Sequence, residues 1–451
     1  MVLESLGSSA YLGNDASQKR LITGTQPRYI VIKDKNGKPI IVDYEKYRKM
    51  IIDYINHNPE RVRPNISSEN GTPYLLGPER GGKRVIDSDS ITVSTLSGSS
   101  ADQFAARPDK KHQYDENVAL DNGQIDNFCQ GKRGDCYLLA SIDSIKRTND
   151  GQEILMKNIQ KNNDGTFTVT LPGAVAARNH YIQQGNEDKC FITGQYTITQ
   201  AAVEKAKQQA GRAYSYGDIE VILLELAMEA FKAEVSQTNK ALGQKSEKYI
   251  AGQFGPGCDS DTLKGGQMYD AVYILTGQKS DVYEAGREKK KNVKLYKPGE
   301  YGYVGEDSKL SKGCLGASKG IVEVNHVYDK ESDLQRMLDR YKGKEGEFSI
   351  TVGFRVAQNG PDGSTKAGGG HALTVSKITD DYVEVVNPWN TSKKERIPRG
   401  DFEAMALNLT VAPMSAKNVD KFYSENVQKE QQNFNPLAFL QNLFNPLSLF
   451  A

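Results

Sequence analysis

The order of its periodic segments most constrains what this chain can fold into. Within residues 118–415, apolar residues recur mainly at helical spacing in the first part, and short runs typical of strands dominate the later part. Helices are expected at residues 136–147, 219–232, 268–276 and 333–341, and strands at 166–171, 190–199, 348–354, 371–378 and 382–386. Helices that come mainly before the strands favour the α+β class.

The remaining segments divide the chain around this core of residues 118–415. Residues 1–27 are polar and rich in Gly, Ser and Asn, so we expect them to be disordered. In residues 28–57, two apolar runs flank Asn36-Gly37, a strong hairpin signal, and a helical pattern follows, which predicts a small hairpin-helix unit. Residues 58–117 are polar and are predicted to be a linker or a pro-segment, and their basic residues suggest self-processing there.

Two further stretches interrupt or follow the core. Residues 284–325 are polar and rich in Gly and Lys, and we interpret them as an insertion. Residues 416–451 are predicted to be a C-terminal tail. A repeated Phe-Asn-Pro-Leu within 434–450 is expected to dock on the protein itself or on a partner, because its prolines prevent one continuous helix.

Composition excludes several classes of function. Lys and Arg number 58 and Asp and Glu 57, so the net charge of +1 gives no bulk attraction to nucleic acid. No apolar run reaches the roughly 18 residues of a membrane helix, and no transmembrane segment is expected. Five cysteines argue against a disulfide framework. The N-terminus lacks the pattern of a cleaved signal peptide, so we expect a cytoplasmic chain or export without such a signal.

The segment from Cys129 to Ala140 carries the most specific chemical signal. A Gly-containing polar turn leads directly into an amphipathic helix whose first turn holds Cys136. The free N–H groups and the dipole of a helix N-terminus favour negative charge, so a thiol there is expected to shift towards the nucleophilic thiolate. The same N–H groups, with the side-chain amide of Gln130, can stabilise an oxyanion. A lone cysteine is more often a small buried residue, so a base elsewhere is required.

His371 is the histidine best suited to be that base. It follows Gly368–Gly370 and is expected to begin an apolar strand, and Asn387 and Trp389 stand at the end of the next predicted strand. Adjacent antiparallel strands would bring Asn387 to His371, where an asparagine can hold one ring nitrogen and direct the other towards the thiol. Trp389, the only tryptophan, would shield this hydrogen bond from water.

Together these motifs resemble the calpain family of papain-like cysteine proteases. The nucleophile motif matches at residues 129–131, 134–136 and 138–140, with Tyr137 where the family usually has tryptophan. The histidine and asparagine motifs match at 370–372 and 387–389, and segments 223–227 and 264–266 resemble the family's Leu-Leu-Glu-Lys-Ala helix and Thr-Gly-Gly segment. The interval from Cys136 to His371 is longer than usual for the family, and that from His371 to Asn387 is shorter.

The resemblance implies a papain-like two-lobed core in a compact, microbial-type relative. A helical lobe would carry Cys136 as the nucleophile. A β-rich lobe would carry His371 as the general base and acid and Asn387 as its orienting residue. Gln130 and the Cys136 N–H would be the oxyanion donors. The implied reaction is endopeptidase cleavage of protein substrates through an acyl-enzyme on Cys136.

The resemblance also raises the question of calcium. The family's core binds calcium as an activator, whereas the chemistry itself requires no cofactor. The positions that correspond to one such site are Asp126, Asn127 and Glu225. Asn127 stands where a carboxylate is expected, and a lost carboxylate weakens a calcium site.

Two alternatives remain open at this point. Cys-His-Asn chemistry does not decide which group accepts the acyl group, so a transamidase or deamidase is the first alternative to a protease. An inactive binding protein that keeps the fold is the second, although Cys136, His371, Asn387 and Gln130 are all present.

Overall fold

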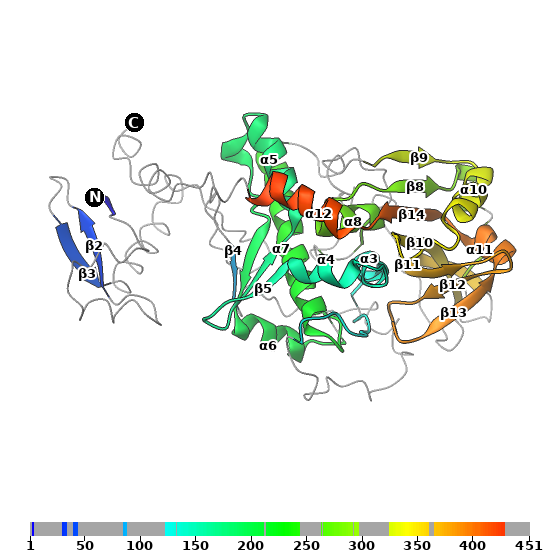
Figure 1. Ribbon diagram of the computed structural model, residues 1–451, viewed down its shortest axis with the longest axis horizontal. Coiled ribbons are helices and arrows are strands. Elements are labelled where there is room, and N and C mark those ends of the chain that lie inside the picture. The colour runs from blue at the N-terminus through cyan, green and yellow to red at the C-terminus, as the bar shows by residue number, and fades with distance from the viewer. Residues whose placement is uncertain are drawn as a thin grey trace. The chain divides into compact units, whose positions relative to one another are not determined.

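The computed structural model describes residues 2–3, 29–33, 39–43, 84–87, 122–131, 133–211, 213–243, 263, 265–291, 293–296, 324–359 and 365–428 (Figure 1). The chain divides into two compact units. The first comprises Met1–Ile66, Tyr74–Gly81 and Gln428–Ala451, and the second comprises Ser67–Pro73 and Gly82–Val427. The helix expected after residue 43, most of the predicted linker 58–117, the middle of the predicted insertion and the repeat within 434–450 lie outside the described residues.

The first unit contains a three-stranded antiparallel sheet in the order β1-β2-β3. Its strands are β1 (Val2–Leu3), β2 (Tyr29–Lys33) and β3 (Pro39–Asp43). The pairing of β2 with β3 confirms the hairpin predicted around Asn36-Gly37. β1 lies within residues 1–27, for which the sequence predicts no order. The unpaired edge of a hairpin offers backbone groups to which such a short segment can bond.

The second unit contains a seven-stranded mixed sheet in the order β13-β12-β11-β10-β14-β8-β9. Its neighbours are antiparallel except for β8 and β9, which are parallel. The strands are β8 (Asp281–Glu284), β9 (His326–Tyr328), β10 (Phe348–Asn359), β11 (Thr365–Ile378), β12 (Tyr382–Val386), β13 (Lys394–Pro398) and β14 (Asn408–Pro413).

A four-stranded sheet, also mixed, has the order β4-β7-β6-β5. Its strands are β4 (Arg84–Ile86), β5 (Ile159–Lys161), β6 (Phe167–Thr170) and β7 (Gln195–Ile198). β4 comes from the predicted linker and pairs parallel with β7. The buried Arg84 side chain forms an ion pair with Glu234 at 3.1 Å, so these three residues are part of the packed fold and not a solvated linker.

The α-helices of the second unit are as follows: α3 (Cys136–Lys146), α4 (Gly151–Lys157), α5 (Pro172–Gln183), α6 (Gln200–Gln208), α7 (Ile219–Ala241), α8 (Met268–Thr276), α9 (Arg287–Lys291), α10 (Glu331–Tyr341), α11 (Arg399–Met405) and α12 (Ala416–Tyr423). A 3₁₀ turn at Glu187–Lys189 and a π-helical turn at Ser424–Gln428 complete the described elements. No helix among the described residues combines the length and apolar character needed to cross a bilayer.

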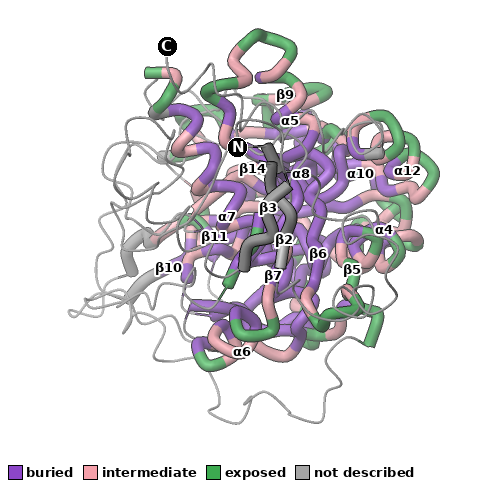
Figure 2. The backbone as a smooth tube through the Cα atoms, turned by 90° about the vertical axis from the view of Figure 1, so that its left-hand side faces the viewer, coloured by how far each residue is buried: buried purple, intermediate pink, exposed green. Residues whose placement is uncertain are grey.

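Two apolar cores underlie this arrangement. One consists of residues from α3, α7, α8 and the four-stranded sheet. The other consists of residues from the seven-stranded sheet, α10 and α11. Figure 2 shows α8 and β6 buried along their length. The described residues therefore form a mixed α+β fold with two mixed sheets, which confirms the predicted class.

Several boundaries differ from the sequence prediction. α8 and β12 have the predicted bounds, but β11 begins at Thr365, so His371 lies inside the strand and does not open it. The glycines before His371 carry no apolar pattern, yet Gly370 and residues 365–367 still pair with β10. α12 follows residue 415, where the tail was expected to begin. It packs on the core because Val419 is buried and the Phe422 ring meets Tyr273 edge-on.

Candidate active site

Cys136 is the first residue of α3, as the sequence predicts. The apolar residues of this helix, including Leu139 and Ile142, are fully buried in the core that it shares with α7 and α8. The Thr374 hydroxyl on β11 donates to the carbonyl of Ala140 at 2.9 Å. The helix that carries Cys136 is therefore fixed directly on the strand that carries His371.

Two opposing effects act on the half-buried Cys136 thiol. Removal from water raises its pKa to about 11, and the charge of Asp135 adds to this effect. Backbone N–H groups of Ala372, Tyr137 and Cys136 lower the pKa, but burial dominates. Burial therefore outweighs the expected shift of this thiol towards the thiolate, and the thiol needs a base to become nucleophilic.

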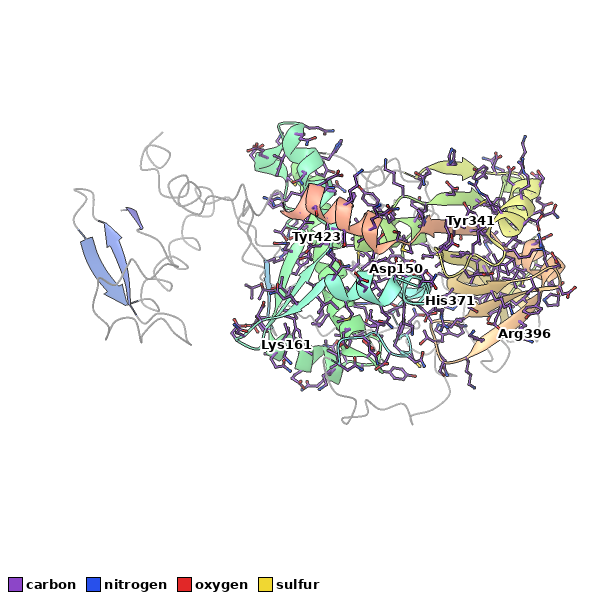
Figure 3. All side chains as sticks on the ribbon, viewed as in Figure 1. Asp150, Lys161, Tyr341, His371, Arg396 and Tyr423 are labelled. Carbon is purple, nitrogen blue, oxygen red and sulfur yellow. The ribbon has the colours of Figure 1, made fainter. Side chains whose placement is uncertain are left out.

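His371 and Asn387 meet as the sequence predicts. Nε2 of His371 lies 2.9 Å from Oδ1 of Asn387, and both residues are buried. A carboxamide oxygen can only accept, so Nε2 of His371 carries the proton and Nδ1 is left as an acceptor. Ala372, whose N–H approaches the Cys136 thiol, is the next residue after His371. The Cys136 thiol on α3 therefore meets β11 at the residue next to His371, whose place is labelled in Figure 3.

Trp389 covers this pair. Its ring centroid lies 4.5 Å from that of His371, with the two planes tilted by 32°. Its backbone N–H donates to Oδ1 of Asn387 at 3.0 Å, so the same oxygen accepts from both residues. Since Trp389 is itself buried, it keeps water from the hydrogen bond that orients the imidazole.

The loop before Cys136 is bonded to the turn that follows Asn387. The Gln130 N–H donates to the carbonyl of Pro388 at 2.8 Å. The Phe128 N–H donates to Oγ1 of Thr391 at 2.8 Å, and the same hydroxyl donates back to the Phe128 carbonyl. Thr391 was not identified from the sequence. Its position in a polar turn, just after the asparagine motif, is the only signal that could have pointed to it.

The side chain of Gln130 is buried and points into the protein. Its Nε2 donates to the carbonyl of Arg133 at 2.7 Å and to Oδ1 of Asp135 at 3.0 Å. In this arrangement both hydrogens of the amide are used within the loop. Gln130 can donate to a substrate oxygen only if it releases one of these partners.

The other matched segments border the same loop. The Gly265 N–H donates to the carbonyl of Gly134 at 2.8 Å. Lys232, on α7, donates to the Gly265 carbonyl at 2.8 Å and to the Tyr137 hydroxyl at 3.0 Å. A Cβ on Gly266 would lie 2.3 Å from the Tyr137 ring, so only glycine fits there. The segment at 264–266 therefore borders the loop that leads into α3.

Glu225, expected as a calcium ligand, lies behind this loop and is fully buried. Its carboxylate accepts from the N–H and the hydroxyl of Ser215. Burial, together with the neighbouring Asp135, raises the pKa of Glu225 well above its usual range. In this fold the Glu225 carboxylate is therefore occupied by Ser215.

Asp126 and Asn127 also have other partners. The Asp126 carboxylate accepts from the side-chain amides of Asn122 at 2.6 Å and Gln124 at 3.2 Å. The Asp126 carbonyl and the Asn127 side-chain oxygen both face the ammonium of Lys146. Within the described ranges, no group of three or more His, Cys, Asp or Glu side chains could hold a metal ion. The residues expected for calcium therefore do not fit that ion.

No family model matches this chain, and a search of curated proteins likewise finds no match.

Proposed function

We propose that this chain is a cysteine endopeptidase of the calpain type, with a papain-like arrangement of a Cys136-bearing helical lobe and a β-rich lobe. One observation carries the proposal. The Cys136 thiol meets the N–H of Ala372, while the adjacent His371 is hydrogen-bonded to Asn387 at 2.9 Å. In this proposal Cys136 is the nucleophile, His371 the base and Asn387 the orienting group, and the three residues come from separate motifs.

The reaction starts from a neutral thiol. Because burial raises the Cys136 pKa to about 11, Nδ1 of His371 takes the proton as the sulfur attacks the carbonyl carbon of the substrate. The imidazolium that forms keeps its Nε2–H on Asn387. It then returns a proton to the leaving amine, which yields the acyl-enzyme, and water hydrolyses the thioester by the reverse sequence.

The oxyanion of each step needs hydrogen-bond donors directed at it. The backbone N–H of Cys136, at the N-terminus of α3, is one. Gln130 is the second donor in this proposal, and its Nε2 exchanges the 3.0 Å bond to Asp135 for the substrate oxygen. The alternative to a role as oxyanion donor is that Gln130 only holds the loop, through its bonds to Arg133 and Asp135.

The test is covalent labelling of the purified chain with a peptidyl epoxide, followed by peptide mass mapping. Labelling at Cys136 that is lost in His371→Ala supports the proposal. Labelling of Cys129 and Cys190 at the same rate as Cys136, or none at Cys136, refutes it. A turnover assay with a protein substrate and a primary amine distinguishes hydrolysis from transfer of the acyl group to the amine.

A further inference from the structure

We propose that Lys146 is a positioning residue whose ammonium fills the cation position beside Asp126 and Asn127, so that the loop before Cys136 assembles without a metal ion. The claim that this loop serves a nucleophile rests on the proposed function. The claim that a lysine ammonium fills this position rests on the geometry around Lys146, and the position itself is the calcium position that the resemblance implies.

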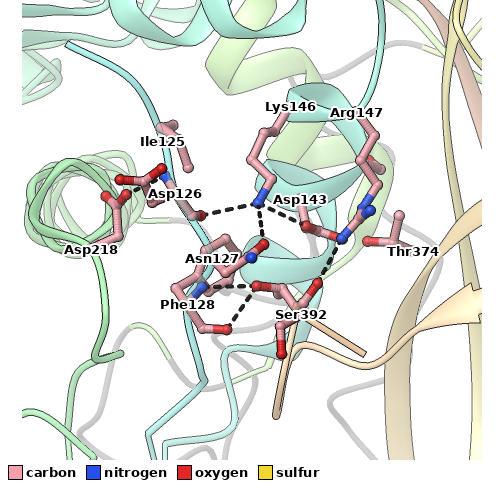
Figure 4. A network of polar contacts seen from close by, with 12 residues as sticks. Ile125, Asp126, Asn127, Phe128, Asp143, Lys146, Arg147, Asp218, Thr374 and Ser392 are labelled. Carbon is pink, nitrogen blue, oxygen red and sulfur yellow. Dashed lines mark hydrogen bonds and ion pairs between the residues drawn. The ribbon is translucent and has the colours of Figure 1, made fainter. Parts of the chain in front are cut away.

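Three oxygens surround the ammonium (Figure 4). Nζ of Lys146 lies 3.0 Å from the Asp126 carbonyl, 3.4 Å from Oδ1 of Asn127 and 3.4 Å from Oδ1 of Asp143. These distances suit an ammonium, whereas calcium binds about six to eight oxygens at about 2.3–2.6 Å. Three oxygens are thus too few for calcium, and their distances from the central atom are longer than calcium–oxygen bonds. The position is already occupied by a positive charge, the Lys146 ammonium.

The position of Lys146 on α3 explains why it reaches these oxygens. It lies in the last helical turn, three residues after Asp143, so both side chains project from the same face. The Lys146 side chain is only 10 % exposed and the Asp143 side chain 1 %. Nζ also lies 5.5 Å from the centre of the Phe128 ring, which adds a cation–π contact. A cation at the end of a helix is further favoured by the helix dipole.

The contact closes a ring in the chain. Residues 126–136 run to the start of α3, and Lys146 at its other end bonds back to residues 126 and 127. The amides between these ends are fixed in turn. The backbone N–H of Asp126 donates to the Asp218 carboxylate, and that of Phe128 donates to the Thr391 hydroxyl. The N–H of Cys129 donates to the Tyr216 carbonyl, and that of Gln130 donates to the Pro388 carbonyl. Loss of the ammonium would therefore loosen the segment that sets the position of Cys136.

Arg147 strengthens this junction from the other side. It donates to Oδ2 of Asp143 at 2.8 Å and to the Thr391 carbonyl at 2.8 Å. Asp143 thus stands between two cations. In Lys146→Met the acid keeps Arg147, so the variant removes the ammonium without leaving a buried carboxylate unpaired.

The experiment compares the wild-type chain, Lys146→Met and Lys207→Met, each with calcium and with a chelator. Lys207 is the matched control, because it also pairs with an acid three residues earlier on its helix, Glu204 at 3.2 Å. Two quantities are measured: hydrogen exchange of the peptide that covers residues 126–130, and the rate of Cys136 labelling.

We expect the wild type to give the same exchange and labelling with calcium and with chelator. Lys146→Met should exchange residues 126–130 several-fold faster and label at least about tenfold more slowly, a factor that corresponds to about 1.4 kcal/mol. Lys207→Met should match the wild type. The proposal is overturned if calcium slows exchange of this peptide in the wild type, or if Lys146→Met exchanges like the wild type.

The two proposals can fail separately. If no variant is labelled at Cys136, the protease proposal falls, while hydrogen exchange still decides the role of Lys146. If Lys146→Met does not fold, the calcium titration of the wild type still decides whether a metal acts at this position.

Discussion

Asn387 offers the sharpest test of the candidate site, because one of its atoms serves two residues. Its Oδ1 accepts from Nε2 of His371 at 2.9 Å and from the Trp389 N–H at 3.0 Å. Replacement by alanine removes both bonds in a buried place. The imidazole loses the contact that fixes its tautomer and its direction, and the indole-bearing turn loses a backbone bond.

The two losses have separate consequences. An unsatisfied buried donor costs about 1–3 kcal/mol, so the two bonds together should lower the free energy of unfolding by about 2–6 kcal/mol. Only the bond to His371 bears on the proton transfer. At about 1.4 kcal/mol per factor of ten, its loss should slow Cys136 labelling by about 5- to 150-fold.

The assay is the second-order rate of Cys136 labelling at neutral pH, with urea unfolding measured on the same samples. Asn390→Ala is the matched control. Oδ1 of Asn390 also accepts two bonds, from the N–H of Ser392 at 3.0 Å and its hydroxyl at 2.6 Å, but neither involves His371. We expect this control to lose stability and to label at nearly the wild-type rate. Equal slowing in both variants would refute the reasoning, since a disordered turn would then explain the effect.

Three further outcomes follow from buried charges. In His371→Ala, alkylation of Cys136 by a small reagent should keep rising towards alkaline pH, because burial raises the thiol pKa to about 11; a plateau near neutral pH would contradict this. Arg84→Met should lower the unfolding free energy in urea by about 3–5 kcal/mol by leaving Glu234 unpaired, and adding Glu234→Gln should recover part of it. Burial and the nearby Asp218 raise the Glu220 pKa from 4.5 to about 7, so this group stabilises the fold below pH 4.5 and the contribution is lost as the pH rises to about 7. In Glu220→Gln the urea midpoint should change less between about pH 5 and 8 than it does in the wild type. The difference should correspond to about 1–2 kcal/mol.

Local patterns predicted much of the fold where a segment buries its own apolar face. α8 and β12 have their predicted bounds, and α3 begins at Cys136, because each is a segment whose residues are almost all buried. β4 could not be predicted in this way. It has three residues in a polar stretch, and its pairing with β7 and its buried ion pair are both long-range interactions.

The candidate site shows the same division. Motif residues such as His371 and Asn387 could be paired from the sequence, because adjacent antiparallel strands carry them. The bonds of Phe128 and Gln130 to the turn after Asn387 could not be predicted, because they join segments that are far apart in the sequence. Phe128 and Thr391, for example, are 263 residues apart. Burial of the Cys136 thiol, which reverses the expected shift of its pKa, likewise depends on how α3 packs on β11.

Lys146 shows why a correspondence of single positions is a weak guide to a cation site. Asp126, Asn127 and Glu225 were selected by their alignment with a motif, but their side chains have separate partners in the fold. The residue that supplies the charge is ten positions beyond Cys136, and only the helical phase of α3 brings it back to the loop. A covalently attached cation cannot dissociate, so its effect does not vary with ion concentration. If Lys146 holds this loop, no calcium is needed at this position, and the calcium titration of the wild type tests that statement.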